Sequence, residues 1–136
     1  MQPADRPRNV NPAELAEARG YSHATVAGDT VWVGGQVGSD ATGRIVEPDD
    51  MVAQYGRAIQ NVGVALRAAG FVPEDTVKLT YYVTDIKAYR ESRSALGAVY
   101  RKFFRSDYPA STLIEVRSLV DPDALVEIDA VAVRKS

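Results

Sequence analysis

The sequence predicts one α+β domain, in which two helices cover one face of a β-sheet and the elements follow the order ββαβαββ. Three observations support this fold class. Two segments carry apolar residues at helical spacing. The segments around them read as short strands bounded by turn residues. The chain of 136 residues is 46% hydrophobic, which suffices for one buried core. We therefore expect a single domain spanning residues 1–136.

The first part of the chain contains an arm and two strands. Residues 1–19 include three prolines and little periodicity, so we expect an irregular N-terminal arm, with at most a short helix at Pro12–Ala18. Strands are predicted at Tyr21–Ala27 and Thr30–Val37, because the Gly-Asp pair between them is typical of a two-residue hairpin turn. The next segment, Ser39–Arg44, is predicted to be a loop.

The first helix is predicted at Asp49–Gly70. Its apolar residues recur every three or four positions: Val52, Tyr55, Ile59, Val62, Leu66 and Ala69. An aspartate at its start can cap the N-terminus, and Gly70 suits its end. Gly56 and Gly63 lie inside the helix, where each costs about 1 kcal/mol relative to alanine. We expect close packing against another element at these two positions.

The second part of the chain predicts a strand at Thr76–Thr84, a helix over 86–105 capped by Asp85, and strands at Ser111–Ser118 and Leu125–Val133. The last strand is apolar on one face and mixed on the other, where it carries two carboxylates. Two helices on one face leave the second face of the sheet bare. The apolar residues expected there predict that another subunit covers it.

Composition and charge exclude several classes of function. The net charge of −2 disfavours nucleic acid as the main partner. The chain has no cysteine and one histidine, so one copy cannot form a thiolate or multi-histidine metal site. No apolar run approaches the ~20 residues that span a bilayer, and the N-terminus lacks the apolar segment of a secretory signal. We expect a cytoplasmic protein without a membrane partner.

Three segments carry a resemblance to a known family. They are the Gly35-Gln36 pair that follows YSHATVAGDTVWV-Gly34, the YPA-x-x-x-x-E-V segment at 108–116, and VEIDAVAV at 126–133. Together they resemble the RidA/YjgF family, also called L-PSP endoribonucleases, over about residues 17–134. The resemblance implies a chorismate-mutase-like fold and a homotrimer with a central β-barrel. It also implies a small-molecule cleft at each subunit interface.

The best-studied members of this family hydrolyse reactive enamines and imines to a keto acid and ammonia, without a cofactor. By this resemblance, Glu127 matches the acidic residue that positions the attacking water. Tyr21 matches a tyrosine of the cleft, and Gly35 and Gln36 match two further positions of the substrate site. A trimer salt bridge is the alternative interpretation of Glu127.

The chain departs from that subgroup at positions that bind the substrate. Ser111 stands where the subgroup has the arginine that grips the substrate carboxylate. Gly97 stands in place of an asparagine, and Leu113 in place of a cysteine. We therefore interpret the chain as a member outside the arginine-containing deaminase subgroup, with a different substrate. Ser111 and Thr112 are the candidate ligand contacts on this strand.

Other basic residues could supply the missing cation. A replacement arginine could come from a neighbouring subunit or from the arm, which carries Arg6, Arg8 and Arg19. The basic residues Arg101, Lys102 and Arg105 are interpreted instead as the solvated C-terminal end of a helix, where they complement the helix dipole. Trp32 is interpreted as a core or interface residue.

Three functions remain open at this point. The first is hydrolysis of a small imine or enamine by water activated near Glu127. The second is a non-catalytic trimer that binds a metabolite in the same cleft, which the loss of the arginine and asparagine favours. The third is ribonuclease activity, which neither a histidine pair nor the charge supports.

Overall fold

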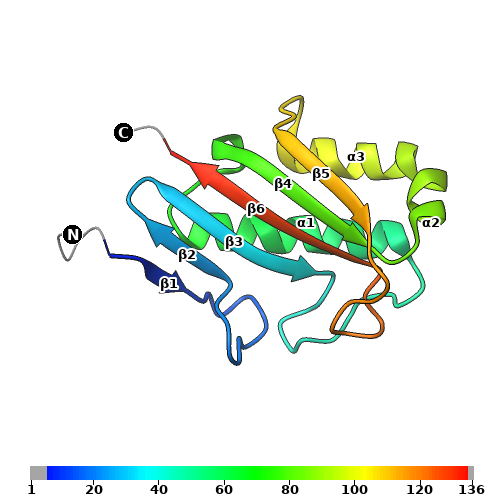
Figure 1. Cartoon of the computed structure of the whole chain (residues 1–136), viewed down its shortest axis with the longest axis horizontal. Helices are drawn as coiled ribbons and strands as arrows, with labels where there is room; N and C mark the ends of the chain where they lie inside the picture. Colours follow the sequence, from blue (N-terminus) through cyan, green and yellow to red (C-terminus); the bar gives the residue numbers. More distant parts are fainter. Residues whose placement is uncertain (1–5, 135–136) are drawn as a thin grey trace.

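The computed structural model describes residues 6–134, which form a six-stranded sheet with helices on one face (Figure 1). The strands lie in the order β1-β2-β3-β6-β4-β5. The elements are β1 (Arg8–Val10), β2 (Ala24–Ala27), β3 (Thr30–Val37), α1 (Met51–Ala68), the 3₁₀ turn η2 (Pro73–Asp75), β4 (Thr76–Val83), α2 (Ile86–Glu91), α3 (Arg93–Phe104), β5 (Ala110–Glu115) and β6 (Val126–Val133). The predicted α+β class, with two long helices on one face, is confirmed.

All neighbouring strands pair antiparallel except β4 and β5, which are parallel. The β4–β5 crossover runs through α2 and α3, as a parallel pair requires. The last two strands of the sequence are not neighbours, because β4 lies between β5 and β6. The sheet therefore ends at β1 on one side and at β5 on the other.

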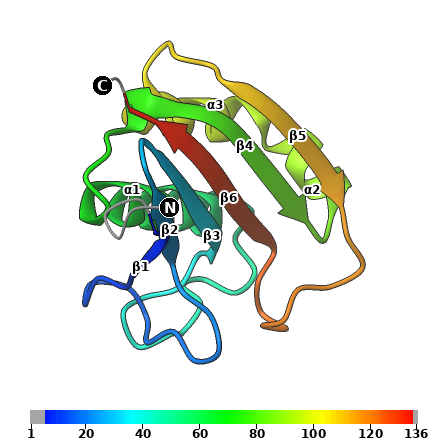
Figure 2. The same ribbon diagram turned by 60° about the vertical axis from the view of Figure 1, so that its left-hand side comes forward.

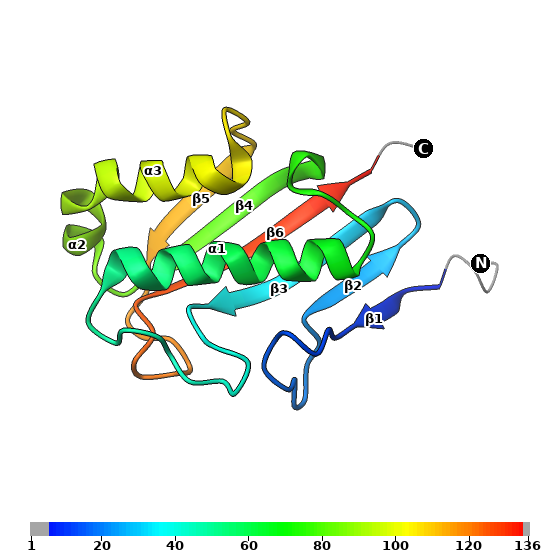
Figure 3. The same ribbon diagram turned by 180° about the vertical axis from the view of Figure 1, so that it is seen from behind.

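The core lies between the sheet and the helices. In the central strand β6, alternate side chains are buried under the helices: Val126, Ile128, Ala130 and Ala132. They meet the buried stripe of α1, which runs from Tyr55 to Leu66. Figure 3 shows α1 and α3 side by side across this face. Because successive side chains of a strand point to opposite faces, every second residue of each strand joins the core.

Helix α1 begins and ends as the sequence predicts. The carboxylate of Asp50 accepts a hydrogen bond from the backbone N–H of Ala53 at 3.0 Å, and Gly70 has a positive φ of 88°. Close packing is confirmed at Gly56, where an added Cβ would lie 3.4 Å from Val99 of α3. The prediction of close packing against another element is wrong at Gly63, where the nearest atoms belong to Arg67 of the same helix.

Several predicted boundaries were wrong. The arm is not wholly irregular, because Arg8–Val10 pairs with β2 as an edge strand. Pro12–Ala18 forms a turn and no helix, and β2 begins at Ala24 rather than Tyr21. The helix expected over 86–105 breaks at Ser92, whose φ of −101° and ψ of 4° leave the helical region.

The second face of the sheet is bare within the described chain. In Figure 2 the helices lie behind the sheet and no element covers the face toward the viewer. Trp32 on this face is 48% exposed, and Ile114 and Val133 are also exposed, so Trp32 is not a core residue of one chain. None of the helices within residues 6–134 is long and apolar enough to span a membrane.

One buried amide connects α1 to two loops. The side-chain nitrogen of Gln54 donates to the carbonyl oxygens of Glu47, Pro48 and Asp123 at 2.9–3.1 Å. Its oxygen accepts from the backbone N–H of Leu125 at 2.8 Å. Because Gln54 is fully buried, water cannot supply these four hydrogen bonds when the side chain is removed.

We expect Gln54→Ala to lower the free energy of unfolding by about 2–4 kcal/mol, since each orphaned buried group costs about 1–3 kcal/mol. Urea unfolding followed by circular dichroism measures this loss. Gln60→Ala is the matched control, because Gln60 is exposed on the same helix. Equal stabilities of the two variants would contradict the role assigned to Gln54.

Candidate functional site

The predicted site residues lie on opposite faces of the sheet. Glu127 pairs with Tyr82 and points to the bare face. Ser111 pairs with Leu79, which is buried, and therefore points to the helical face. One copy of the chain cannot bring these two side chains together. The candidate residues therefore form two groups. We call the group that contains Glu127 the bare-face group, and the cavity that Ser111 lines the helical-face pocket.

The bare-face group is built on a β-bulge between β3 and β6. Val33 pairs with Ala130 and Gln36 with Ile128, so Gly34 and Gly35 together oppose Asp129. The carboxyl group of Glu127 lies directly over Gly35. A Cβ added to Gly35 would lie 2.6 Å from that carboxyl group. Glycine at position 35 is therefore what leaves room for the acid.

The surroundings of Glu127 favour its protonated form. Burial raises the pKa of the Glu127 carboxyl group, and the negative charge of Asp129 raises that pKa further. Asp129 itself accepts a hydrogen bond of 3.0 Å from the hydroxyl of Tyr82. A half-buried carboxyl group with a raised pKa is suited to accepting and returning a proton.

Gln36 and Tyr21 flank the bulge in different ways. Gln36 is buried, and its nitrogen donates to the carbonyl of Gly34 at 3.2 Å and to Nδ1 of His23 at 3.1 Å. Tyr21 is exposed and packs edge-on against the His23 ring, with 5.5 Å between centroids. The structure thus places Gln36 as a support of the bulge. Tyr21 is open to a ligand or a partner.

His23 is occupied at both ring nitrogens. Besides the bond from Gln36, its Nε2 lies 2.6 Å from the carbonyl of Ala16. These partners assign the neutral tautomer with the proton on Nε2, because Nδ1 accepts from the amide. His23 therefore ties the arm to the bulge. No cluster of three metal-ligating side chains occurs in the described part of the chain.

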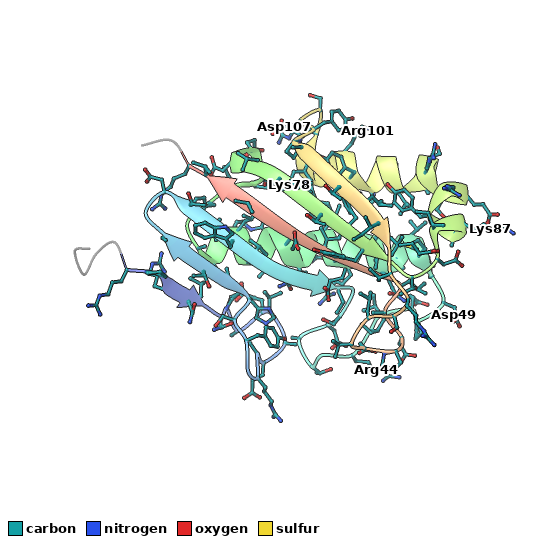
Figure 4. The ribbon with its side chains drawn as sticks, in the orientation of Figure 1. Arg44, Asp49, Lys78, Lys87, Arg101 and Asp107 are labelled. Carbon is teal, nitrogen blue, oxygen red and sulfur yellow. The ribbon has the colours of Figure 1, made fainter. Side chains whose placement is uncertain are left out.

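Thr112 does not share a face with Ser111. Its hydroxyl accepts a hydrogen bond of 2.6 Å from Nζ of Lys78, on the bare face (Figure 4). Ser111 instead donates to the carbonyl of Pro109 at 3.0 Å. The two predicted contacts of this strand therefore belong to different groups of the divided site.

The helical-face pocket lies between α3 and β5 and has a volume of about 400 Å³. Ser111, Gly97 and Leu113, the three positions where the resemblance implies a departure from the deaminase subgroup, all line it. Sequence reasoning did not assign the other lining residues to a ligand site; they are Tyr55, Tyr81, Tyr89, Arg93, Leu96, Tyr100, Arg101 and Tyr108. Tyr55 belongs to the predicted apolar stripe of the first helix, but such a stripe cannot distinguish core residues from pocket residues.

The cations near Ser111 do not come from the arm. Arg8 lies on β1, at the opposite edge of the sheet from β5, and Arg19 pairs with Glu17 at 3.2 Å. Arg101 is exposed, as expected for a solvated helix end, and it also lines the pocket. In the sequence, the only signal for a place of Arg101 in the pocket is its spacing of one helical turn from Gly97.

The fold and the divided site define a small α+β protein with a ligand-sized pocket on one face of its sheet and a perturbed carboxyl group on the other. The family described as Endoribonuclease L-PSP matches residues 11–134, so the chain belongs to that family. The resemblance to RidA/YjgF proteins is thereby confirmed.

Known relatives resemble the chain over most of its length. A 2-iminobutanoate/2-iminopropanoate deaminase from Capra hircus is 35% identical over 129 residues, which cover 93% of this chain and 90% of the relative. The crystal structure of the YjgF gene product from E. coli superimposes with a TM-score of 0.81 at 28% identity, and that of E. coli TdcF with bound serine gives the same two values. Each comparison covers 94% of this chain and 99% of the other.

We expect Gly35→Ala to displace the Glu127 carboxyl group toward solvent and to return its pKa toward the ordinary value, because a Cβ cannot fit beneath it. Carbon-13 NMR titration of the glutamate side chains measures this. Gly63→Ala is the matched control, since its Cβ meets only the flexible end of Arg67. An unchanged Glu127 pKa in Gly35→Ala would refute the contact.

Proposed function

We propose that the protein hydrolyses the C=N bond of a small imine or enamine, using water activated by Glu127 in a cleft between two copies of the chain. The observation that carries the proposal is the Glu127 carboxyl group, which is half-buried over Gly35 and has a raised pKa. The name of the Capra hircus relative supports the reaction class.

The division of the site favours an assembly. Glu127 and Ser111 are two strands and three residues apart, or ~14 Å by strand geometry, and they point to opposite faces. The bare face also exposes Trp32, Ile114 and Val133, which a partner can cover. A homotrimer with its sheets inward would place the bare-face group of one copy against the helical-face pocket of the next.

The chemistry follows from the state of Glu127. Its carboxylate takes a proton from a water molecule, whose oxygen forms a bond to the imine carbon. The proton passes to the nitrogen and gives a tetrahedral carbinolamine. The carboxylate then takes the proton of the carbinolamine hydroxyl and returns it to the nitrogen, so that the C=O bond forms, the C–N bond breaks, and ammonia leaves with a keto compound remaining. The residues of the chain supply the base and the positioning, and the balance requires no redox partner.

The substrate would differ from that of the arginine-containing members. The hydroxyl of Ser111 is directed to the Pro109 carbonyl and cannot grip a carboxylate as a guanidinium does. This departure, with Gly97, also favours the second candidate, a trimer that binds a metabolite without turnover. Assays of turnover distinguish the two candidates.

We expect Glu127→Gln to lower ammonia release from enzymatically generated imines of Ala, Leu, Phe and Glu by about 10²–10⁴-fold, since it removes the base. The same variant should be more stable than wild type at pH 7. The native state with a raised carboxyl pKa binds more protons, so its stability falls as pH rises through that pKa. Turnover by Glu127→Gln at the wild-type rate would exclude Glu127 as the base.

Asp129→Asn is the matched control for that experiment. It removes a carboxylate from the same face, and with it the charge that raises the pKa of Glu127. We expect turnover to persist, with the acidic limb of the kcat/KM profile moved to lower pH. Absence of turnover in wild type, with retained ligand binding, would establish the non-catalytic candidate instead.

A mixing experiment tests whether the site is shared between copies. Glu127→Gln inactivates the bare-face group, and Leu113→Trp fills the helical-face pocket. Refolding an equal mixture of the two inactive variants should restore about one quarter of wild-type turnover, because that share of interfaces in a ring would pair an intact pocket with an intact Glu127. A site contained in one chain would give no recovery.

A further inference from the structure

The helical-face pocket carries positive charge in an acidic protein. Two guanidinium groups, from Arg93 and Arg101, line it, and no carboxylate among residues 6–134 does. The whole chain has a net charge of −2. Neither arginine forms an ion pair with a residue of the described chain. The charge of the pocket is therefore available to an anionic ligand, and its volume lies in the range of about 300–1,000 Å³ that holds small molecules.

Arg101 occupies space that a side chain at position 97 would fill. A Cβ added to Gly97 would lie 3.2 Å from Nη1 of Arg101 and 4.0 Å from its Cζ. The guanidinium therefore folds back along α3 toward the pocket. In Figure 4, Arg101 lies near Asp107 and the beginning of β5. The small residues Gly97 and Ser111 leave space in the pocket, and Arg101 places its planar cation beside that space.

Most of the remaining lining residues are aromatic, together with Leu96 and Leu113. Five of the seven tyrosines of the chain line this one pocket. Tyr100 and Tyr108 stack with centroids 5.4 Å apart and planes 9° apart, and Tyr55 and Tyr81 stack at 6.0 Å and 10°. Tyr108 is 65% exposed, so its outer part remains open at the edge of the pocket. Such ring surfaces favour a flat, apolar partner.

The three most buried tyrosines of the pocket, Tyr55, Tyr81 and Tyr100, remain neutral at physiological pH. Burial raises the pKa of Tyr100 to about 12, and it raises the pKa values of Tyr55 and Tyr81 further. These three buried rings form an uncharged aromatic wall, and the exposed ring of Tyr108 offers the open surface for a ligand. The combination of a fixed cation and neutral rings selects for a carboxylate attached to an aromatic group.

We propose that the pocket binds aromatic carboxylates, with Arg101 gripping the carboxylate and the tyrosines enclosing the ring. The substrate class is then an α-imino acid with an aromatic side chain. This last step rests on the proposed function. Arg101 would replace, from α3, the anchor that the deaminase subgroup places on the neighbouring strand. The pair Gly97 and Arg101 determines the specificity.

Binding of unreactive acids tests the assignment without turnover. Isothermal titration of the full chain with 3-phenylpropanoate should show binding, while pentanoate, which lacks the ring, and 3-phenylpropanol, which lacks the charge, should each bind at least tenfold more weakly. Pentanoate affinity equal to that of 3-phenylpropanoate would overturn the aromatic assignment. Equal affinity of the alcohol would overturn the role of the cation.

Two variants assign the anchor. Arg101→Ala should weaken 3-phenylpropanoate binding about tenfold or more, because a charge-assisted bidentate pair is lost. Lys102→Ala removes the same charge from the next helical position, which does not line the pocket, and should leave binding unchanged. Gly97→Asn keeps all charges but fills the space beside the guanidinium, and should weaken binding as well. Equal effects of Arg101→Ala and Lys102→Ala would overturn the proposal.

The proposed reaction and the proposed ligand class can be refuted independently of each other. Ammonia release that is fastest for the imine of Phe, and that Arg101→Ala slows mainly through KM, supports both. Binding of 3-phenylpropanoate that depends on Arg101, without ammonia release from any imine, supports the ligand class and overturns the reaction. Ammonia release that is fastest for the imine of Ala and insensitive to Arg101→Ala overturns the ligand class and supports the reaction.

Discussion

The alternation of side chains along β6 is the constraint on which the rest of the structure depends. This central strand pairs with β3 on one side and β4 on the other. Its apolar residues lie under the helices, and Glu127 and Asp129 are consequently forced to the bare face. A slip by one residue would bury both carboxylates beneath α1. Burial of the core thus fixes the position of the acid, and separates it from the pocket that the helices form.

The same strand also sets the state of that acid. Because Glu127 and Asp129 are two residues apart on one face, each experiences the charge of the other, and the bulge at Gly34 and Gly35 brings backbone close to Glu127. Such an arrangement raises the pKa of Glu127, so it reduces the stability of the fold as pH rises through that pKa. Groups with perturbed pKa values cluster at functional sites, and the proposed function rests on this feature of Glu127.

The sequence predicted the elements whose pattern is local. The stripe of α1 and the alternation of β4 and β6 require only neighbouring residues, and these elements lie within two residues of their predicted bounds. The edge strand β1 depends on pairing with β2, which is not visible in three residues of sequence. The break at Ser92 depends on one backbone conformation, to which a serine gives no clear signal.

The sequence names candidate site residues, but it does not predict how they are arranged. Motif positions pointed to Glu127, Gly35 and Ser111, yet the faces of Ser111 and Glu127 depend on how β4, β5 and β6 are registered in space. Arg101 was assigned to solvent because a helix end attracts cations through its dipole. Arg101 is exposed, as predicted, but its guanidinium also lies beside Gly97, a contact that exists only once α3 is folded.

The departures at 97 and 111 are therefore better understood together than singly. Loss of a side chain at position 97 removes a polar group, but it also creates the space beside the Arg101 guanidinium. Loss of an arginine at position 111 removes one cation, but two others already line the same pocket. Neither guanidinium group forms an ion pair with a residue of the described chain, and both line the pocket together with stacked tyrosines. In the proposed ligand site the cation therefore comes from α3 rather than from β5, which changes the shape of the ligand that can reach it.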